Sequence, residues 1–273
     1  MLSPNRIERI CLQEFGHFIR RHRRYFITFL AIYSYSIFSW NRLRLLRAGH
    51  CLAQHVDDVL DGDRDVSVPP LEYLDDLLGQ IETGDFDLTA SIPALACFVF
   101  QGADASLRAE LHALFATLRF DRQRVEAQLL LSKAELDEVH ENTFVHSMNA
   151  SLMMVGSPLR ATDIHEMVGA LSWVSPMRDL REDLSRGLVN IPREILKETK
   201  NLEYDFLIEQ PSIRAWIREE FLKGQACLQA IPGKLWGHFP KRGVIEIWAF
   251  YFEISRYAVR YRRKYREILS GTK

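Results

Sequence analysis

Glycine and proline are scarce in this sequence, with 14 glycines and 10 prolines among 273 residues, and no segment repeats. With 47% hydrophobic and 26% charged residues, this composition argues against a disordered chain and a solenoid and is typical of a globular protein. Alternating apolar and polar residues, the pattern of strands, are also rare, whereas apolar residues recur at helical spacing almost throughout. The sequence therefore predicts an all-α helical bundle in one domain, residues 1–273, with residues 1–30 as a basic extension or first helix.

The sequence also lacks the short motifs of several functional classes. Its four cysteines are far apart and form no CxxC pair, so we expect reduced thiols and a cytoplasmic protein. It contains no glycine-rich dinucleotide loop, no phosphate-binding loop and no GxSxG elbow. No basic face is interleaved with stacking aromatics, which argues against nucleic-acid binding.

One apolar stretch, residues 25–40, raises the question of membrane contact. It is shorter than the roughly 20 apolar residues that cross a bilayer, and it contains three serines. We interpret it as a buried helix. Because the basic run RRHRR precedes it, peripheral contact with a membrane surface is the alternative.

Charge is unevenly distributed, although the net charge is only -1. The first two dozen residues and the last stretch, from Arg256 to Arg266, are basic, whereas acids dominate between Asp57 and Asp87. This segregation suits a protein that holds cations at one place and anions nearby. A basic run is most often a solvated helix face, and contact with diphosphate or anionic lipid is the alternative for Arg256 to Arg266.

Helical periodicity and its punctuation predict the elements. Pro69 and Pro70 open one helix and Gly84 lies just beyond its end, as expected from the preference for proline at helix starts and glycine after helix ends. This helix runs through Leu77 and Leu78 to just before Gly84. The other predicted helices cover residues 42–60, 107–131, 137–155, 162–184, 212–229 and 244–269.

The first candidate site is HVDDVLD, residues 55–61. Asp57 and Asp61 are four residues apart and therefore project from one helix face, where like charges repel unless a cation neutralises them. Asp58 lies between them. An acidic cluster at a helix end is more often simply solvated, so this motif needs a partner before it indicates a metal site.

The second candidate site is RDLRED, residues 178–183, which again places two aspartates, Asp179 and Asp183, four apart. Ser175 lies four residues before Asp179 and adds a hydroxyl oxygen to the same stripe. Apolar neighbours such as Trp173 and Met177 predict that this helix is partly buried, where acids are rarely without a role. Salt bridges to neighbouring arginines are the structural alternative.

Two helices that each carry such a pair suit Mg²⁺, which prefers oxygen ligands and binds through a few carboxylates, water and substrate phosphates. If the pairs face each other, they can hold magnesium ions around one diphosphate and promote its departure. Aromatic side chains can stabilise the allylic cation that remains, and a dry cavity protects it. The candidates on suitable segments are Phe144, Trp173, Trp248, Phe250, Tyr251 and Phe252.

At these motifs the sequence resembles the squalene/phytoene synthases, which join two isoprenoid diphosphates head to head. The segment MRDLREDLSRGLVNIPREIL, residues 177–196, is similar to the second aspartate signature of that family, and AQHVDDVLD, residues 53–61, is similar to the first. The resemblance implies an all-α isoprenoid-synthase fold with a central cavity, Mg²⁺ as cofactor and a prenyl diphosphate substrate such as farnesyl or geranylgeranyl diphosphate.

Residue by residue, the resemblance assigns roles to the motif positions. Asp57 and Asp61 match the first metal-binding pair, Asp179 and Asp183 match the second, and Ser175 is a further candidate ligand. Four residues are candidate contacts for the substrate: Arg178, Tyr251, Gln54 and Asp58.

The sequence also departs from the family pattern at the diphosphate end. Gln54 replaces an arginine, Ser175 an asparagine and Ser172 a glutamine. In the segment NTFVHSMNASLMM, Asn142 and His146 stand where tyrosine and valine are expected.

These motifs and departures leave three hypotheses for the function. The leading hypothesis is a magnesium-dependent transferase that condenses two prenyl diphosphates. The first alternative is a class I terpene cyclase that acts on one prenyl diphosphate, since such cyclases use a serine in a comparable position. The second is a non-catalytic family member that keeps the fold and binds or assembles with other molecules.

Overall fold

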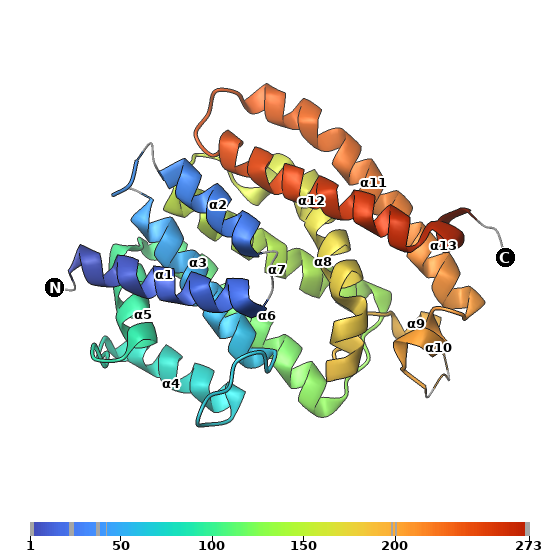
Figure 1. The fold of residues 1–273 in the computed structure, drawn as a ribbon, viewed down its shortest axis with the longest axis horizontal. Coiled ribbons are helices and arrows are strands. Elements are labelled where there is room, and N and C mark those ends of the chain that lie inside the picture. Colours follow the sequence, from blue (N-terminus) through green and yellow to red (C-terminus); the bar gives the residue numbers. More distant parts are fainter. Residues whose placement is uncertain are drawn as a thin grey trace. The chain divides into compact units, whose positions relative to one another are not determined.

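The computed structural model describes residues 3–21, 25–36, 39–41, 43–197, 199 and 201–270. Helices and connecting turns, with no strand, make up this described part, so the predicted all-α class is confirmed (Figure 1). The basic residues Arg23 and Arg24 and the apolar residues Ile37 and Phe38, which enter the predictions above, lie outside the described residues.

The helices fall into two compact units, one formed by Met1–Arg119 and Asn149–Pro158 and the other by Phe120–Met148 and Leu159–Lys273. The expectation of a single domain stays a prediction. The first unit contains α1 (Pro4–Arg21), α2 (Tyr25–Ser36), α3 (Arg44–Leu60), α4 (Pro70–Thr83) and α5 (Ser91–Gly102). Two long helices, α6 (Ala105–Ala127) and α7 (Lys133–Met154), contribute residues to both units.

Helix α3 is the centre of the first unit and packs against α1, α2, α4 and α5. Leu46, Cys51 and Val59 of this helix are all buried. Burial of this apolar face provides most of the driving force for docking the helix, since isolated helices of this length are marginal in water. The core therefore fixes the orientation of the acidic residues at the C-terminal end of α3.

Several predicted boundaries agree with the structure, and the exceptions have physical reasons. Helix α4 begins at Pro70, and Gly84 caps its end in the left-handed conformation, as predicted. Helix α5 was not predicted, because its sequence SIPALACFVFQG is apolar on every side and shows no helical period. Helix α6 ends at Ala127, earlier than predicted, and Gln128 adopts a positive φ of 50°.

Helix α2 differs from the buried helix that we expected for the apolar stretch. Phe29, Ile32 and Tyr33 pack against the core of the first unit, whereas Phe26 and Leu30 are exposed. The helix is apolar around its whole circumference, so one side remains in solvent after the other has docked. In the described residues, no helix combines the length and apolar character needed to cross a membrane.

The second unit is built around α8 (His165–Arg186), which packs against α11 (Pro211–His238) and α12 (Val244–Lys264). Helix α11 extends nine residues beyond the predicted end at Gln229 and passes through Pro232, because Ile231 and Leu235 continue its buried face. The short elements of this unit are η1 (Ala161–Ile164), α9 (Arg193–Leu196), α10 (Tyr204–Leu207) and α13 (Arg266–Ser270).

Glycine allows α8 and α11 to approach closely. A Cβ atom built on Gly224 of α11 would lie 2.0 Å from Cδ2 of Trp173 on α8. Trp173 is itself buried and meets Phe221 and Tyr261 edge-on, with ring centroids 5.6 and 5.5 Å away. The indole of Trp173 therefore fills the space that a side chain at position 224 would need.

Candidate functional site

The first aspartate motif occupies the last turn of α3 in the first unit. Asp57 is half-buried, Asp58 is buried, and Asp61 is exposed at the C-cap position just after the helix. The backbone N–H of Asp61 still donates to the carbonyl of Asp57, at 2.9 Å, so the helical turn continues through this residue. The spacing of four residues therefore has the helical geometry that the sequence predicted.

Gln54 provides amide hydrogens to this motif. Its Nε2 donates to Oδ2 of Asp57 at 3.0 Å and to Oδ1 of Asp58 at 2.8 Å. An amide that bridges two carboxylates reduces their mutual repulsion without adding a positive charge. The glutamine that departs from the family pattern thus acts first on the aspartates of its own helix.

A buried acid on α1 supports the same end of α3. Glu14 accepts a hydrogen bond from Arg64, with Nη2 3.1 Å from Oε1, and its Oε2 lies 3.0 Å from Nδ1 of His55. Burial alone would raise the pKa of Glu14, but the hydrogen bonds from His55 and Arg64 outweigh it and lower this pKa. Nε2 of His55 is 2.9 Å from the hydroxyl of Tyr73, which ties α4 into the network.

The second aspartate motif lies on α8 in the second unit, where Ser175, Asp179 and Asp183 share one face and are all half-buried. The Nε of Arg178 donates to both carboxylate oxygens of Asp179 at 2.9 Å. Its Nη2 also donates to Asp179 and lies 3.4 Å from Oγ of Ser175. The salt bridge that we considered as the structural alternative is therefore present at Asp179.

Arg178 is positioned on its other side by an aromatic ring. Its Cζ lies 5.2 Å from the ring centroid of Tyr257 on α12, a distance at which a guanidinium is attracted to the ring. The guanidinium therefore lies at the surface of α8 between a carboxylate, a hydroxyl and an aromatic ring.

Asp183 is positioned by residues that the sequence reasoning missed. Nδ2 of Asn190 donates to its Oδ2 at 3.0 Å, and Oδ1 of Asn190 accepts from Nη2 of Arg124 at 3.2 Å. Arg124 is fully buried and also donates to the carbonyl of Val189 at 2.8 Å and to Asp121 at 2.6 Å. The only sequence signal was that Asn190 belongs to the segment RGLVNIP that follows the second motif.

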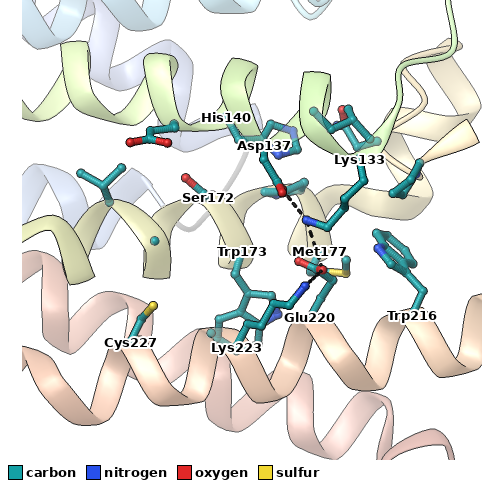
Figure 2. A pocket seen from close by; sticks show the side chains of 18 of the residues that line it. Lys133, Asp137, His140, Ser172, Trp173, Met177, Trp216, Glu220, Lys223 and Cys227 are labelled. Atoms are coloured by element: carbon teal, nitrogen blue, oxygen red, sulfur yellow. Dashed lines mark hydrogen bonds and ion pairs between the residues drawn. The ribbon is translucent and has the colours of Figure 1, made fainter.

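A pocket of about 390 Å³ lies within the second unit, and Ser175, Asp179 and Asp183 are not among the residues that line it. Figure 2 shows its walls on α7, α8 and α11. Ser172, seven residues before Asp179, lines the pocket and lies on the same stripe of α8. The volume falls within the range of about 300–1,000 Å³ that is typical of small-molecule sites.

The pocket combines apolar and polar walls. Trp173, Met177 and Trp216 form its apolar part, whereas Lys133 pairs with Asp137 and with Glu220, as the dashed lines in Figure 2 show. Among the described residues, three buried polar atoms of this wall have no hydrogen-bond partner. They are Oγ of Ser172 and Nε1 of Trp173 and Trp216.

His140 also lines the pocket. Burial and the positive charge of Arg124 lower the pKa of His140 to about 4, although a hydrogen bond with Asn190 opposes the shift. The imidazole is therefore neutral at pH 7 and can accept or donate one hydrogen bond.

The predicted cavity aromatics are only partly found at this pocket. Trp173 lines it, but Phe250 and Phe252 are exposed on α12, so their assignment to a cavity is wrong for the described structure. Tyr251, a predicted substrate contact, is half-buried and meets Trp248 edge-on with ring centroids 5.4 Å apart. Its side chain belongs to this aromatic group on α12 and is not part of the pocket wall.

The donor atoms of each motif fit magnesium by type, since carboxylate and hydroxyl oxygens are the ligands that it prefers. Within each unit, the described residues contain no group of three or more acidic, histidine or cysteine side chains arranged to hold a metal ion. Two carboxylates per motif agree with the mode of binding in which water and substrate phosphates complete the shell. The expectation that the two pairs face each other stays a prediction.

No protein-family model matches this chain, and no curated protein is significantly similar to it. The resemblance to the squalene/phytoene synthases therefore rests on the motif residues.

Proposed function

We propose that this protein is a magnesium-dependent prenyltransferase that ionises an allylic isoprenoid diphosphate and joins two such substrates head to head. One observation carries the proposal. A single face of α8 presents Ser175, Asp179 and Asp183, all half-buried. Other residues of the same helix, Ser172, Trp173 and Met177, line a pocket of ligand size. Two carboxylates at helical spacing repel each other, and this repulsion favours the binding of cations between them.

Asp57, Asp61, Asp179 and Asp183 would hold magnesium, with Ser175 as a further oxygen ligand. Magnesium supplies Lewis-acid neutralisation of the charge that develops on a departing diphosphate. Asn190 fixes the orientation of Asp183, and Gln54 fixes that of Asp57. These contacts keep the carboxylates in one geometry, which lowers the cost of organising the site.

Arg178 would bind the diphosphate. Its guanidinium pairs with Asp179, and Tyr257 supports it from the side. An arginine can bind phosphate oxygens through two parallel hydrogen bonds, so a diphosphate can compete with Asp179 for the guanidinium of Arg178. The apolar wall formed by Trp173 and Met177 is suited to contact with a hydrocarbon chain.

The test is incubation of the purified protein with farnesyl or geranylgeranyl diphosphate and Mg²⁺, followed by mass spectrometry of the products. We expect a hydrocarbon or alcohol with twice the carbon number of the substrate, together with released diphosphate. Asp179→Asn should lower turnover by at least about 100-fold, because it weakens the binding of the magnesium that would neutralise the departing diphosphate. Turnover in this variant that equals the wild type would contradict the metal assignment.

A matched control for this substitution is Asp205→Asn. Asp205 also pairs with an arginine, Arg181, but both side chains are mostly exposed and lie outside the α8 stripe. Exposed ion pairs contribute about 0–1 kcal/mol. This variant should therefore retain wild-type turnover and stability.

A terpene cyclase is the second candidate, favoured by the size of the pocket. A volume of about 390 Å³ lies near the lower end of the usual range for ligand sites, which suits one prenyl chain better than two. A product with the same carbon number as the substrate would identify the cyclase.

A non-catalytic binding protein is the third candidate, and the hydrogen bonds of the aspartates favour it. Asp57, Asp179 and Asp183 each accept hydrogen bonds from donors of the chain itself, Gln54, Arg178 and Asn190. The cost of keeping these acids without a metal is therefore smaller than their charge alone suggests. Absence of diphosphate release, together with no Mg²⁺-dependent thermal stabilisation by a diphosphate analogue, would favour this candidate.

A further inference from the structure

Large apolar side chains are unusually exposed where α11 is followed by α12. Trp236 is 65% exposed, Phe239 59%, Ile245 61% and Phe252 62%. Single exposed apolar residues are common on protein surfaces, but a contiguous group of this size usually marks a contact surface.

The rings of this group touch one another. The centroid of Trp236 lies 6.0 Å from that of Phe239 and 5.9 Å from that of Trp248, which in turn lies 5.8 Å from that of Phe252. Figure 1 shows α11 and α12 running side by side from the loop that joins them. We name Trp236, Phe239, Ile245, Trp248 and Phe252 the aromatic tip.

Positive charge adjoins the aromatic tip. Lys241 and Arg242 lie in the loop between the helices and are exposed. Along α12, Arg256 and Arg263 follow Phe252 at intervals of four and eleven residues, which places all three on one helix face. Arg256 and Arg263 are both exposed.

We infer that the aromatic tip and the arginine-bearing face of α12 bind the surface of an anionic lipid bilayer. Tryptophan and phenylalanine side chains partition into the interface between lipid headgroups and hydrocarbon. Lysine and arginine beside them are attracted to anionic headgroups. A protein partner with an apolar surface accounts for the tip alone, whereas an anionic bilayer accounts for the tip and the arginines together.

The geometry of α12 allows the aromatic tip and the arginines to contact one bilayer at the same time. A helix rises about 1.5 Å per residue, so Arg256 lies about 6 Å and Arg263 about 16 Å beyond Phe252 along the axis. An inclined α12 would bury the tip below the headgroups and leave the arginines at their level. The inference does not depend on the proposed function. It extends the lipid contact considered from the sequence for Arg256 to Arg266 by adding the aromatic tip, and it is separate from the contact considered for residues 25–40.

The test is sedimentation of the full chain with vesicles of phosphatidylcholine, with and without phosphatidylglycerol. We expect binding to the anionic vesicles that weakens strongly at about 1 M salt, where the Debye length falls to about 3 Å. The double variant Trp236→Ser/Phe252→Ser should lose at least about tenfold in vesicle affinity, because it removes two apolar anchors. The fold should remain intact, since both side chains are exposed, and circular dichroism checks this.

Two further variants separate the contributions. Leu222→Ser is the matched control, since Leu222 is 62% exposed on the same helix but lies about 21 Å along the axis from Trp236; it should bind like the wild type. Arg256→Gln/Arg263→Gln should lower affinity for anionic vesicles about tenfold and leave any binding to neutral vesicles unchanged.

Three results would overturn the inference. One is sedimentation that is equal with and without vesicles. Another is loss of vesicle affinity in Leu222→Ser that matches the loss in the aromatic double variant. The third is a wild-type dimer in solution that Trp236→Ser/Phe252→Ser converts to a monomer without affecting vesicle binding, which would assign the tip to a second copy of the chain.

Discussion

The substitution Gly224→Ala would place a methyl group where the ring of Trp173 already lies. A Cβ atom at position 224 would be 2.0 Å from Cδ2, 2.1 Å from Cε3 and 2.5 Å from Cγ of that residue. All three distances are far below van der Waals contact. Because Cγ is close to the backbone of α8, rotation of the indole about its side-chain bonds does not relieve the clash easily.

The expected loss of stability is the balance of two opposing effects. Alanine is favoured over glycine inside a helix by about 1 kcal/mol. Overpacking of a filled core costs about 1–3 kcal/mol, and the upper value applies here because Phe221 and Tyr261 block the displacement of Trp173. We therefore expect a net loss of about 2 kcal/mol in the free energy of unfolding.

Urea denaturation followed by circular dichroism measures this change, and Gly233→Ala on the same helix is the control. No atom lies within 4 Å of a Cβ built at Gly233, so the helix preference acts alone there and should increase stability by about 1 kcal/mol. The same glycine-to-alanine change at two positions of one helix should thus have opposite effects on the free energy of unfolding. Equal or higher stability of Gly224→Ala than of the wild type would refute the packing argument.

Other predictions concern the site and the dependence of stability on pH. Asn190→Ala should lower magnesium-dependent turnover or metal affinity about 10- to 100-fold, because Asp183 loses the donor that orients it; unchanged metal affinity would show that Asn190 has no positioning role. Burial lowers the pKa of His50 to about 4. In the unfolded chain this histidine binds a proton already near pH 6.5, so the free energy of unfolding should decrease as the pH falls from about 6.5 to about 4. His50→Gln should flatten this part of the profile of unfolding free energy against pH, and a profile as steep as that of the wild type would assign the proton uptake to another group.

The sequence determined the features that depend on local periodicity. Helical spacing of apolar residues identified the all-α class, and the burial of Leu46, Cys51 and Val59 follows from it. The cap at Gly84 was also predictable, since a left-handed residue after a helix favours glycine over any residue with a side chain. The sequence also predicted that the two aspartates of each pair lie on one helix face, because a separation of four residues places two side chains on one face in any α-helix.

Helix positions could not be predicted from the sequence where amphipathic periodicity was absent, or where a helix continued past a proline. Helix α5 is apolar on all sides and offers no contrast from which a period can be read. Helix α11 continues through Pro232 because buried contacts of Ile231 and Leu235 outweigh the missing hydrogen bond, and this compensation is invisible in a single segment.

Only the tertiary structure decided which groups meet the aspartates. Asp183 is oriented through Asn190 by Arg124, which is 59 residues earlier in the chain, and no sequence pattern links them. The aromatic residues of α12 are another case. The sequence offered Phe252 as a candidate to line a cavity, whereas packing of α12 on α8 and α11 leaves this side chain in solvent. A helical sequence fixes the face on which a side chain lies, but the partner of that face depends on packing between segments that are distant in sequence.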